Sequence, residues 1–157
     1  MIIDSLNEFA DAVSVIQTAG SRFNLGDVID LSQARDIGNG QTVYLMIQVD
    51  TEIITAGSQG SIQFHLVSDA IDTPDTSTAT IHMSSPTYVT DDSAANSPEL
   101  NAGGIIWQVA LPLEGDLYER YLGVQYNVTT EDTTAGAVSA FLTLDPRGWK
   151  AHPDAVN

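Results

Sequence analysis

The sequence predicts an all-β fold, an eight-stranded jelly roll or β-sandwich with a long polar loop and a C-terminal tail. Three observations support this prediction. Short runs rich in β-branched and aromatic residues recur along the chain, turn-forming groups such as Gly38-Asn39-Gly40 separate them, and long segments with the apolar period of a helix are missing. Only residues 5–12 are compatible with a helical turn. The 157 residues suit one domain spanning 1–157, with an N-terminal arm at 1–12 and the tail at 146–157.

Eight runs are expected to form the strands. The run 43–49 is almost continuously apolar, which predicts a strand covered on both faces. The run 121–128 alternates instead, so that its even-numbered residues from Leu122 to Val128 form one apolar face. In chain order the runs are residues 13–16, which is the weakest, 28–31, 43–49, 61–68, 79–83, 105–111, 121–128 and 137–144.

One long connection interrupts this pattern. Residues 84–104 are polar and poor in β-branched residues, and a loop of this length in a compact domain is usually functional or disordered. The tail 146–157 has the same two interpretations, because a polar terminus has little reason to order alone.

The charge balance limits the classes of partner. Five Lys and Arg oppose 21 Asp and Glu, which gives a net charge of −16. Such a surface repels nucleic acid and anionic membranes, and the simplest interpretation is a well-solvated exterior. The chain has no cysteine, which excludes disulfides and thiol chemistry. It shows neither an apolar run of membrane-spanning length nor a signal-peptide pattern, so synthesis in the cytosol is expected.

Catalytic and cofactor motifs are not recognisable, and we therefore expect a binding protein rather than an enzyme, with no cofactor. His65 and His82 fall on strands and are interpreted as half-exposed strand residues, while His152 lies in the tail. Asp30 and Asp50 are the acids closest to strand interiors, and a glycosidase would need two such acids facing each other in a cleft. A glycosidase is therefore the least favoured of the functions considered for this sequence.

No metal site is predicted, although several acids lie close together in the sequence. Carboxylates at loop spacing can hold calcium, but Pro74 interrupts the first set and none of the sets matches a calcium-loop pattern. Clusters of this kind arise by chance in so acidic a chain, and weak calcium binding stays an open alternative. The sets are Asp69, Asp72 and Asp75; Asp91 and Asp92; and Glu131 and Asp132.

Candidate partner-binding residues are the scarce cations and aromatic side chains outside the regular strands. Trp and Arg are enriched at interface anchors, and Arg147, Trp149 and Lys150 form a basic-aromatic group in the tail. Tyr88 in the long loop and Phe9 in the N-terminal arm complete the set. Among the other cations, Arg35 and Arg120 are interpreted as structural; Arg35 is expected to pair with the adjacent Asp36 or with an acid on another strand.

Several short motifs, in order along most of the chain, resemble the capsid cement proteins of Bordetella-phage-type short-tailed phages. The chain departs from that pattern in its longer 84–104 loop and in the tail beyond Asp145. The motifs are Met1-Ile2-Ile3-Asp4; Ala34-Arg35-Asp36-Ile37-Gly38 with Gly40; Val43-Tyr44-Leu45; Val49-Asp50; Thr55-Ala56-Gly57; Arg120-Tyr121-Leu122; Tyr126-Asn127-Val128; Thr134-Ala135-Gly136; and Phe141-Leu142-Thr143-Leu144-Asp145.

The resemblance implies a jelly-roll protein on the outer surface of an icosahedral head, where it bridges subunits of an HK97-type major capsid protein and stabilises the shell. It also implies a symmetric dimer or trimer on capsid symmetry axes, and it carries no enzymatic site. Cementing needs only several weak contacts at once, because effective concentration makes them add. On this hypothesis Arg147 and Lys150 steer the tail to acidic capsid or sister-subunit surface.

A carbohydrate-binding jelly roll for host attachment is the main alternative. That function would favour an exposed aromatic platform, for example Tyr88 or Trp107 in a groove.

Overall fold

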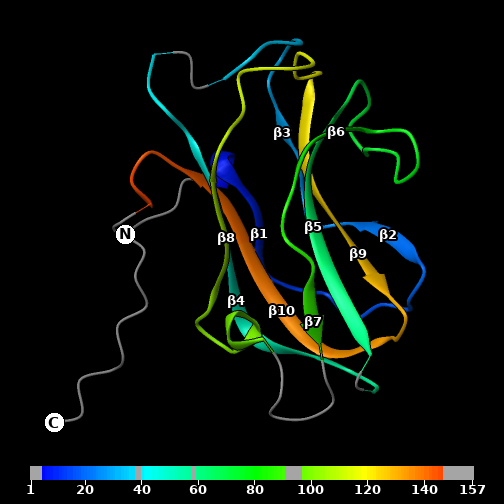
Figure 1. Cartoon of the computed structure of the whole chain (residues 1–157). Helices are drawn as coiled ribbons and strands as arrows, with labels where there is room; N and C mark the ends of the chain where they lie inside the picture. Colours follow the sequence, from blue (N-terminus) through cyan, green and yellow to red (C-terminus); the bar gives the residue numbers. More distant parts are fainter. Residues whose placement is uncertain (1–4, 38–39, 58, 91–96, 147–157) are drawn as a thin grey trace, which may run out of the picture.

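Two antiparallel sheets pack face to face in the computed structural model, which describes residues 5–37, 40–57, 59–90 and 97–146 (Figure 1). Sheet A has the strand order β1-β10-β4-β8. Sheet B has the order β2-β9-β5-β6, with β3 also paired to β9 and β7 also paired to β5. The strands are β1 (Glu8–Ser14), β2 (Ser21–Asn24), β3 (Ile29–Asp30), β4 (Tyr44–Thr55), β5 (Gly60–Asp69), β6 (Thr80–Ser84), β7 (Tyr88–Thr90), β8 (Ile105–Ala110), β9 (Tyr121–Thr129) and β10 (Thr133–Thr143), and two short 3-10 helices are η1 (Ser5–Asn7) and η2 (Pro98–Leu100).

The ten strands occupy eight positions, because two positions are interrupted. β2 and β3 lie one after the other along β9, and β6 and β7 lie one after the other along β5. The pairs are nested: β1 with β10, β2 and β3 with β9, β4 with β8, and β5 with β6 and β7. This is the order of a jelly roll. The predicted fold class is confirmed, and each of the eight predicted runs falls on one of the eight positions.

The N-terminal prediction needs correction. Helical structure covers only Ser5–Asn7, and the chain then continues as β1, in which Ala10 pairs with Ala140 of β10. Among the described residues, the expected arm 1–12 therefore ends at Asn7, and the edge strand that begins at Glu8 includes only the first two residues of the expected strand 13–16. The alternation of β1 is broken by register shifts on either side of Ala10, which hides it from a period-2 analysis.

The core lies between the two sheets and is built from alternate residues of the long strands. Leu122, Val124, Tyr126 and Val128 of β9 are all buried, as their alternation predicted. Tyr126 also contacts Phe64 of β5, with ring centroids 6.0 Å apart. Over the predicted run 43–49, the inward face of central strand β4 is buried, since Leu45, Ile47 and Val49 are each 0% exposed. On the outward face Met46 is buried but Tyr44 and Gln48 are only partly buried, so the predicted cover of both faces holds in part.

One edge of the sandwich is closed by a close backbone approach at Gly26. The Asp27 N–H donates to the Phe9 carbonyl oxygen at 2.7 Å, which joins the break between β2 and β3 to β1 of the other sheet. A Cβ at residue 26 would lie 2.1 Å from that same oxygen, and the residue has a φ of +61°. Glycine is therefore required here.

The described parts of the 84–104 connection are folded against the sandwich. Strand β7 pairs with β5, and η2 presents Leu100, which is 0% exposed. Residues 91–96 lie outside the described residues. None of the helical segments in the described chain has the length and hydrophobicity that crossing a bilayer requires.

Candidate partner-binding surfaces

One end of the sandwich, which we call the upper end, is formed by residues 31–37, 70–79, 111–120 and 144–146. Strands β5, β8 and β10 run toward it, and β4 and β9 start from it, as the pairing of Thr143 with Tyr44 and of Asp69 with Tyr121 shows (Figure 1). The two sheets thus hold all four segments at one end of a rigid frame.

The segment 111–120 is anchored at its C-terminal part. Tyr118 is 1% exposed, its hydroxyl donates to the Pro112 carbonyl at 2.7 Å, and its ring lies 4.3 Å from that of His82. The next amide, of Glu119, donates to the buried Ser68 hydroxyl at 3.0 Å. These contacts fix the backbone on either side of the segment's exposed side chains.

Large apolar side chains are exposed mainly at this end. Leu113 is 50% exposed and Leu117 is 53% exposed, although both belong to the anchored segment. Of the eight large apolar residues that are exposed in the described chain, five lie at or beside the upper end. They are Leu6, which precedes β1, Ile71, Leu113, Leu117 and Leu144.

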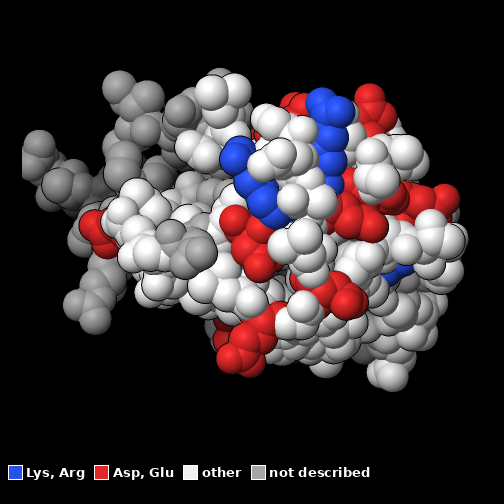
Figure 2. All heavy atoms as spheres, turned by 90° about the horizontal axis from the view of Figure 1, so that it is seen from above, with Lys and Arg blue, Asp and Glu red and all other residues white. Residues whose placement is uncertain are grey.

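Charged groups flank these apolar side chains. Figure 2 shows the upper end from above, with Arg side chains lying among Asp and Glu side chains. Arg120 donates two hydrogen bonds to Asp30, from Nε at 2.9 Å and from Nη2 at 2.8 Å. These bonds are the main cause that lowers the pKa of Asp30 to about 2. The structural role expected for Arg120 is thereby explained, whereas Arg35 is exposed and forms no ion pair within the described residues.

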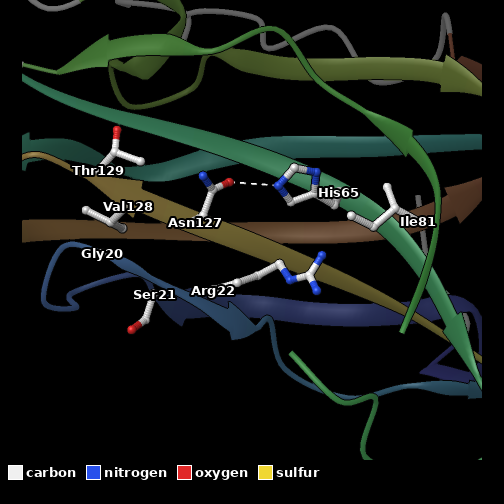
Figure 3. A pocket seen from close by; sticks show the side chains of 8 residues that line it. All are labelled: Gly20, Ser21, Arg22, His65, Ile81, Asn127, Val128 and Thr129. Atoms are coloured by element: carbon white, nitrogen blue, oxygen red, sulfur yellow. Dashed lines mark hydrogen bonds between the residues drawn. The ribbon is translucent and has the colours of Figure 1, made fainter. Parts of the chain in front are cut away.

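A second candidate surface is a groove on the outer face of sheet B, with a volume of about 370 Å³ (Figure 3). It lies beside the segment 70–79, which folds over part of this face and accepts hydrogen bonds from Asn24 and Arg22. The groove is lined by Gly20, Ser21, Arg22, His65, Ile81, Asn127, Val128 and Thr129.

The predicted partner-binding residues are not brought together within the described residues. Arg147, Trp149 and Lys150 lie outside them. Phe9 is 1% exposed and packs in the core, so it does not present a surface to a partner. Tyr88 is partly buried on β7, and its hydroxyl donates to the carbonyl of Ile106.

Neither Trp107 nor Tyr88, the two aromatic residues named as a possible glycan platform, is freely exposed. Trp107 is 7% exposed and belongs to the core cluster, and Tyr88 is held against β8 by the hydrogen bond to Ile106. A sugar ring could not stack on the face of Trp107 without displacing core side chains.

Of the two strand histidines, one is more enclosed than the sequence suggested. His65 is buried, so the expectation of a half-exposed residue is wrong there, and its ring nitrogens contact Ser84 and Asn127. His82 is partly buried, and its Nε2 lies 2.7 Å from the Ser68 hydroxyl. Burial is the main cause that lowers the pKa of each imidazole.

Two of the acids considered for calcium, Asp69 and Asp75, shape a turn, whereas Asp91 and Asp92 lie outside the described residues. Asp69 accepts hydrogen bonds from the amides of Ala70 and Asp75, and Asp75 accepts from those of Ser77 and Thr78. The two Asp75 bonds lower its pKa. Within the described ranges, no three acidic or imidazole side chains are grouped so that they could hold a metal ion.

The two candidate acids of a glycosidase, Asp30 and Asp50, each form hydrogen bonds with another side chain. Asp30 is paired with Arg120, and Asp50 accepts a hydrogen bond from the Ser139 hydroxyl on sheet A at 2.7 Å. They lie on strands of different sheets, β3 and β4, and each has its own partner.

Comparison with known proteins identifies the family of this chain. Residues 9–142 match the model of the Bbp16 family, a Bordetella phage protein family. The chain belongs to the Bbp16 family. The match spans the sandwich from β1 to β10, so the family pattern covers the entire jelly roll of this Bbp16-family chain. No curated protein matches it.

Sequence reasoning missed the residues that the structure places on the two surfaces. Leu113 and Leu117 stand close to a turn signal, Glu114-Gly115-Asp116, and apolar residues so near a turn were a usable sign of exposure. Arg22 stands in the sequence Arg22-Phe23-Asn24-Leu25, whose alternation marks a short strand with polar residues on its outer side.

Proposed function

We propose that this Bbp16-family protein is a capsid cement protein, which binds the outside of an icosahedral phage head and bridges subunits of an HK97-type major capsid protein. Family membership supports a phage protein, and the resemblance in sequence supports the cement role within that class. On this proposal the chain acts by binding, without turnover of a substrate, and its place is the outer capsid surface of the virion.

The observation that carries the proposal is the gathering of exposed apolar side chains at the upper end. A large side chain that is buried on binding contributes roughly 1.5–3 kcal/mol, and such contacts dominate protein interfaces. Leu113 and Leu117 lie on a segment that Tyr118 and Glu119 hold in place, so little ordering entropy is lost when they bind. The upper end therefore suits a protein surface better than a small molecule.

Self-association completes the proposal. A dimer or trimer would present several upper ends at once, and linked contacts gain affinity through effective concentration without any new interaction. The acidic exterior limits non-specific association, so that apolar contacts at one end can act selectively.

A double substitution, Leu113→Ser with Leu117→Ser, tests the role of the upper end. Purified heads stripped of this protein would be incubated with wild type or variant, sedimented, and scored for bound copies. Loss of two apolar contacts is expected to weaken binding by roughly tenfold or more. Both side chains are exposed, so the fold is expected to be unaffected.

The matched control is Ile16→Ser, since Ile16 is 52% exposed but follows β1 at the opposite end of the sandwich. Its occupancy on heads should equal that of wild type. Equal occupancy of the Leu113/Leu117 variant would contradict the assignment of the upper end, and failure of the wild-type protein to bind heads at all would contradict the cement function.

A further inference from the structure

The groove on sheet B contains a cation, Arg22, that forms no direct ion pair within the described residues. Its charge helps to lower the pKa of Asp75, but the Asp75 carboxylate accepts hydrogen bonds from the Ser77 and Thr78 amides and not from Arg22. Arg22 donates from Nε to the Thr76 carbonyl at 2.6 Å, which pins the guanidinium at the side of the 70–79 segment. Within the described chain its two terminal nitrogens have no hydrogen-bond partner, and no carboxylate forms an ion pair with it. Figure 3 shows the guanidinium on the same side of the groove as His65 and Ile81.

This arrangement is unusual for so acidic a chain. Asp and Glu number 21 against five Lys and Arg, yet none of the residues that line the groove is acidic. By contrast, Arg120 at the upper end is bonded twice to Asp30. A partly buried guanidinium gains most from a carboxylate, with which it forms charge-assisted hydrogen bonds, and the groove leaves that partner to be supplied from outside.

A partly buried hydrogen-bond network fixes the orientation of the Asn127 amide, which lines the groove. His65 Nε2 lies 2.7 Å from Asn127 Oδ1 and must donate to it, because a carbonyl oxygen only accepts. His65 Nδ1, 2.8 Å from the Ser84 hydroxyl, is then the acceptor of that hydroxyl. Burial and the nearby charge of Arg22 lower the His65 pKa, which keeps the ring neutral as this network requires. The Asn127 amide nitrogen is turned away from His65 (Figure 3).

The remaining walls fit a short acidic side chain. Donors at hand are the Arg22 terminal nitrogens, the Asn127 amide nitrogen and the exposed Ser21 hydroxyl, while Ile81, 45% exposed, supplies an apolar wall. The Thr129 hydroxyl is paired with that of Ser61. A volume of about 370 Å³ lies near the lower limit of ligand pockets, which suits one side chain and not an extended ligand.

We propose that the sheet B groove binds the carboxylate of a Glu or Asp side chain from an acidic segment of a protein partner. This inference rests on the proposed function, since bridging two subunits requires a contact besides the upper end. The carboxylate accepts hydrogen bonds from the Arg22 terminal nitrogens and from the Asn127 amide nitrogen, and its methylene groups pack on Ile81.

A titration of the full-length, isotope-labelled protein tests the groove without any capsid. The probe is N-acetyl-glutamate methylamide, and its neutral match is N-acetyl-glutamine methylamide. Saturable shifts are expected for the amides of Ser21 and Arg22 and for the side-chain amide of Asn127 with the glutamate probe only. Arg22→Gln should weaken this binding roughly tenfold. Arg35→Gln, which removes an exposed cation outside the groove, should leave it unchanged.

Three results would overturn the inference. The first is equal shifts with the two probes, the second is unchanged glutamate binding in Arg22→Gln, and the third is tighter binding of galacturonate than of the glutamate probe, which would assign the groove to an acidic sugar. The spectrum of each variant reports its folding in the same measurement. If heads bind the protein normally while the probe does not, this inference fails and the cement function stands.

Discussion

Two connections of the jelly roll, residues 84–104 and residues 111–120, contrast in a way that their lengths and polarity do not suggest. The first is long and polar, yet its described parts pack against the sandwich through β7, η2 and the buried Leu100, and Val89 is the one large apolar residue that they expose. The second is short, yet it exposes Leu113 and Leu117. Length and polarity therefore do not indicate which connection offers apolar surface to a partner. That depends on where the sheets direct each connection.

The physical reason lies at the two ends of the sandwich. Residues 97–104 close the end of the core beside β4 and β8: the Val49 amide donates to the Gly104 carbonyl and the Gly103 amide donates to the Val49 carbonyl, each at 2.8 Å. The segment 111–120 instead closes the core with Leu111 at its start and Tyr118 near its end. Leu113 and Leu117, on either side of Gly115, are left outside.

The largest expected effect comes from a pair of matched truncations, one in each connection. Leu100→Ala should destabilise the fold by about 2–5 kcal/mol, because Leu100 is 0% exposed and its removal leaves a cavity. Leu113→Ala should change the free energy of unfolding by no more than about 0.5 kcal/mol. Urea unfolding followed by tryptophan fluorescence measures both, and similar values for the two variants would erase the contrast.

Much of the fold followed from the sequence because the long strands carry strong patterns. Alternation from Leu122 to Val128 predicted the inward face of β9, and the continuous run 43–49 predicted a strand with cover on both faces, which the structure places inside sheet A. Each pattern reflects local geometry, since alternate side chains of a strand point to opposite faces.

Such patterns could not predict the short strands or a single buried residue in a polar stretch. β2 has Phe23 as its one large apolar residue, and β7 is three residues long; both exist because they pair with β9 and β5. Leu100 is a single apolar residue in a polar stretch, and only the fold decides that it is buried. The groove around Arg22 likewise joins four strands, β2, β5, β6 and β9, that are remote in sequence.

A smaller effect is expected at Tyr88, which stands in the first connection. Its hydroxyl donates to the Ile106 carbonyl of edge strand β8, so this one bond links the edges of the two sheets. Tyr88→Phe should cost about 0.5–1.5 kcal/mol, the usual net contribution of such a bond. The ring remains, so the loss measures the bond and not the packing. Binding to stripped heads should be unchanged, whereas reduced binding at full stability would make Tyr88 a contact residue.

The smallest expected effect is a pH dependence of stability, which should involve residues 111–120 and not residues 84–104. His82 contacts Tyr118 of the segment 111–120 and Ser68 beneath it, and burial lowers the His82 pKa below its usual 6.5, although Asp116 and Asp36 oppose the shift. The unfolded chain then binds more protons than the folded one just below pH 6.5. Stability from this group is therefore complete above that pH and is lost as pH falls toward the folded-state pKa.

Acidification should accordingly loosen 111–120 before it affects η2. In an NMR titration from pH 7.5 to 5, we expect the amides of Tyr118 and Glu119 to shift together with the His82 ring, while the amide of Leu100 stays constant. His82→Gln should remove the shared transition from the Tyr118 signal. If the Tyr118 and Leu100 amide signals instead changed with the same pH midpoint, acid would be unfolding the sandwich as a whole. The two connections would then differ in their exposure of apolar side chains but would not open independently.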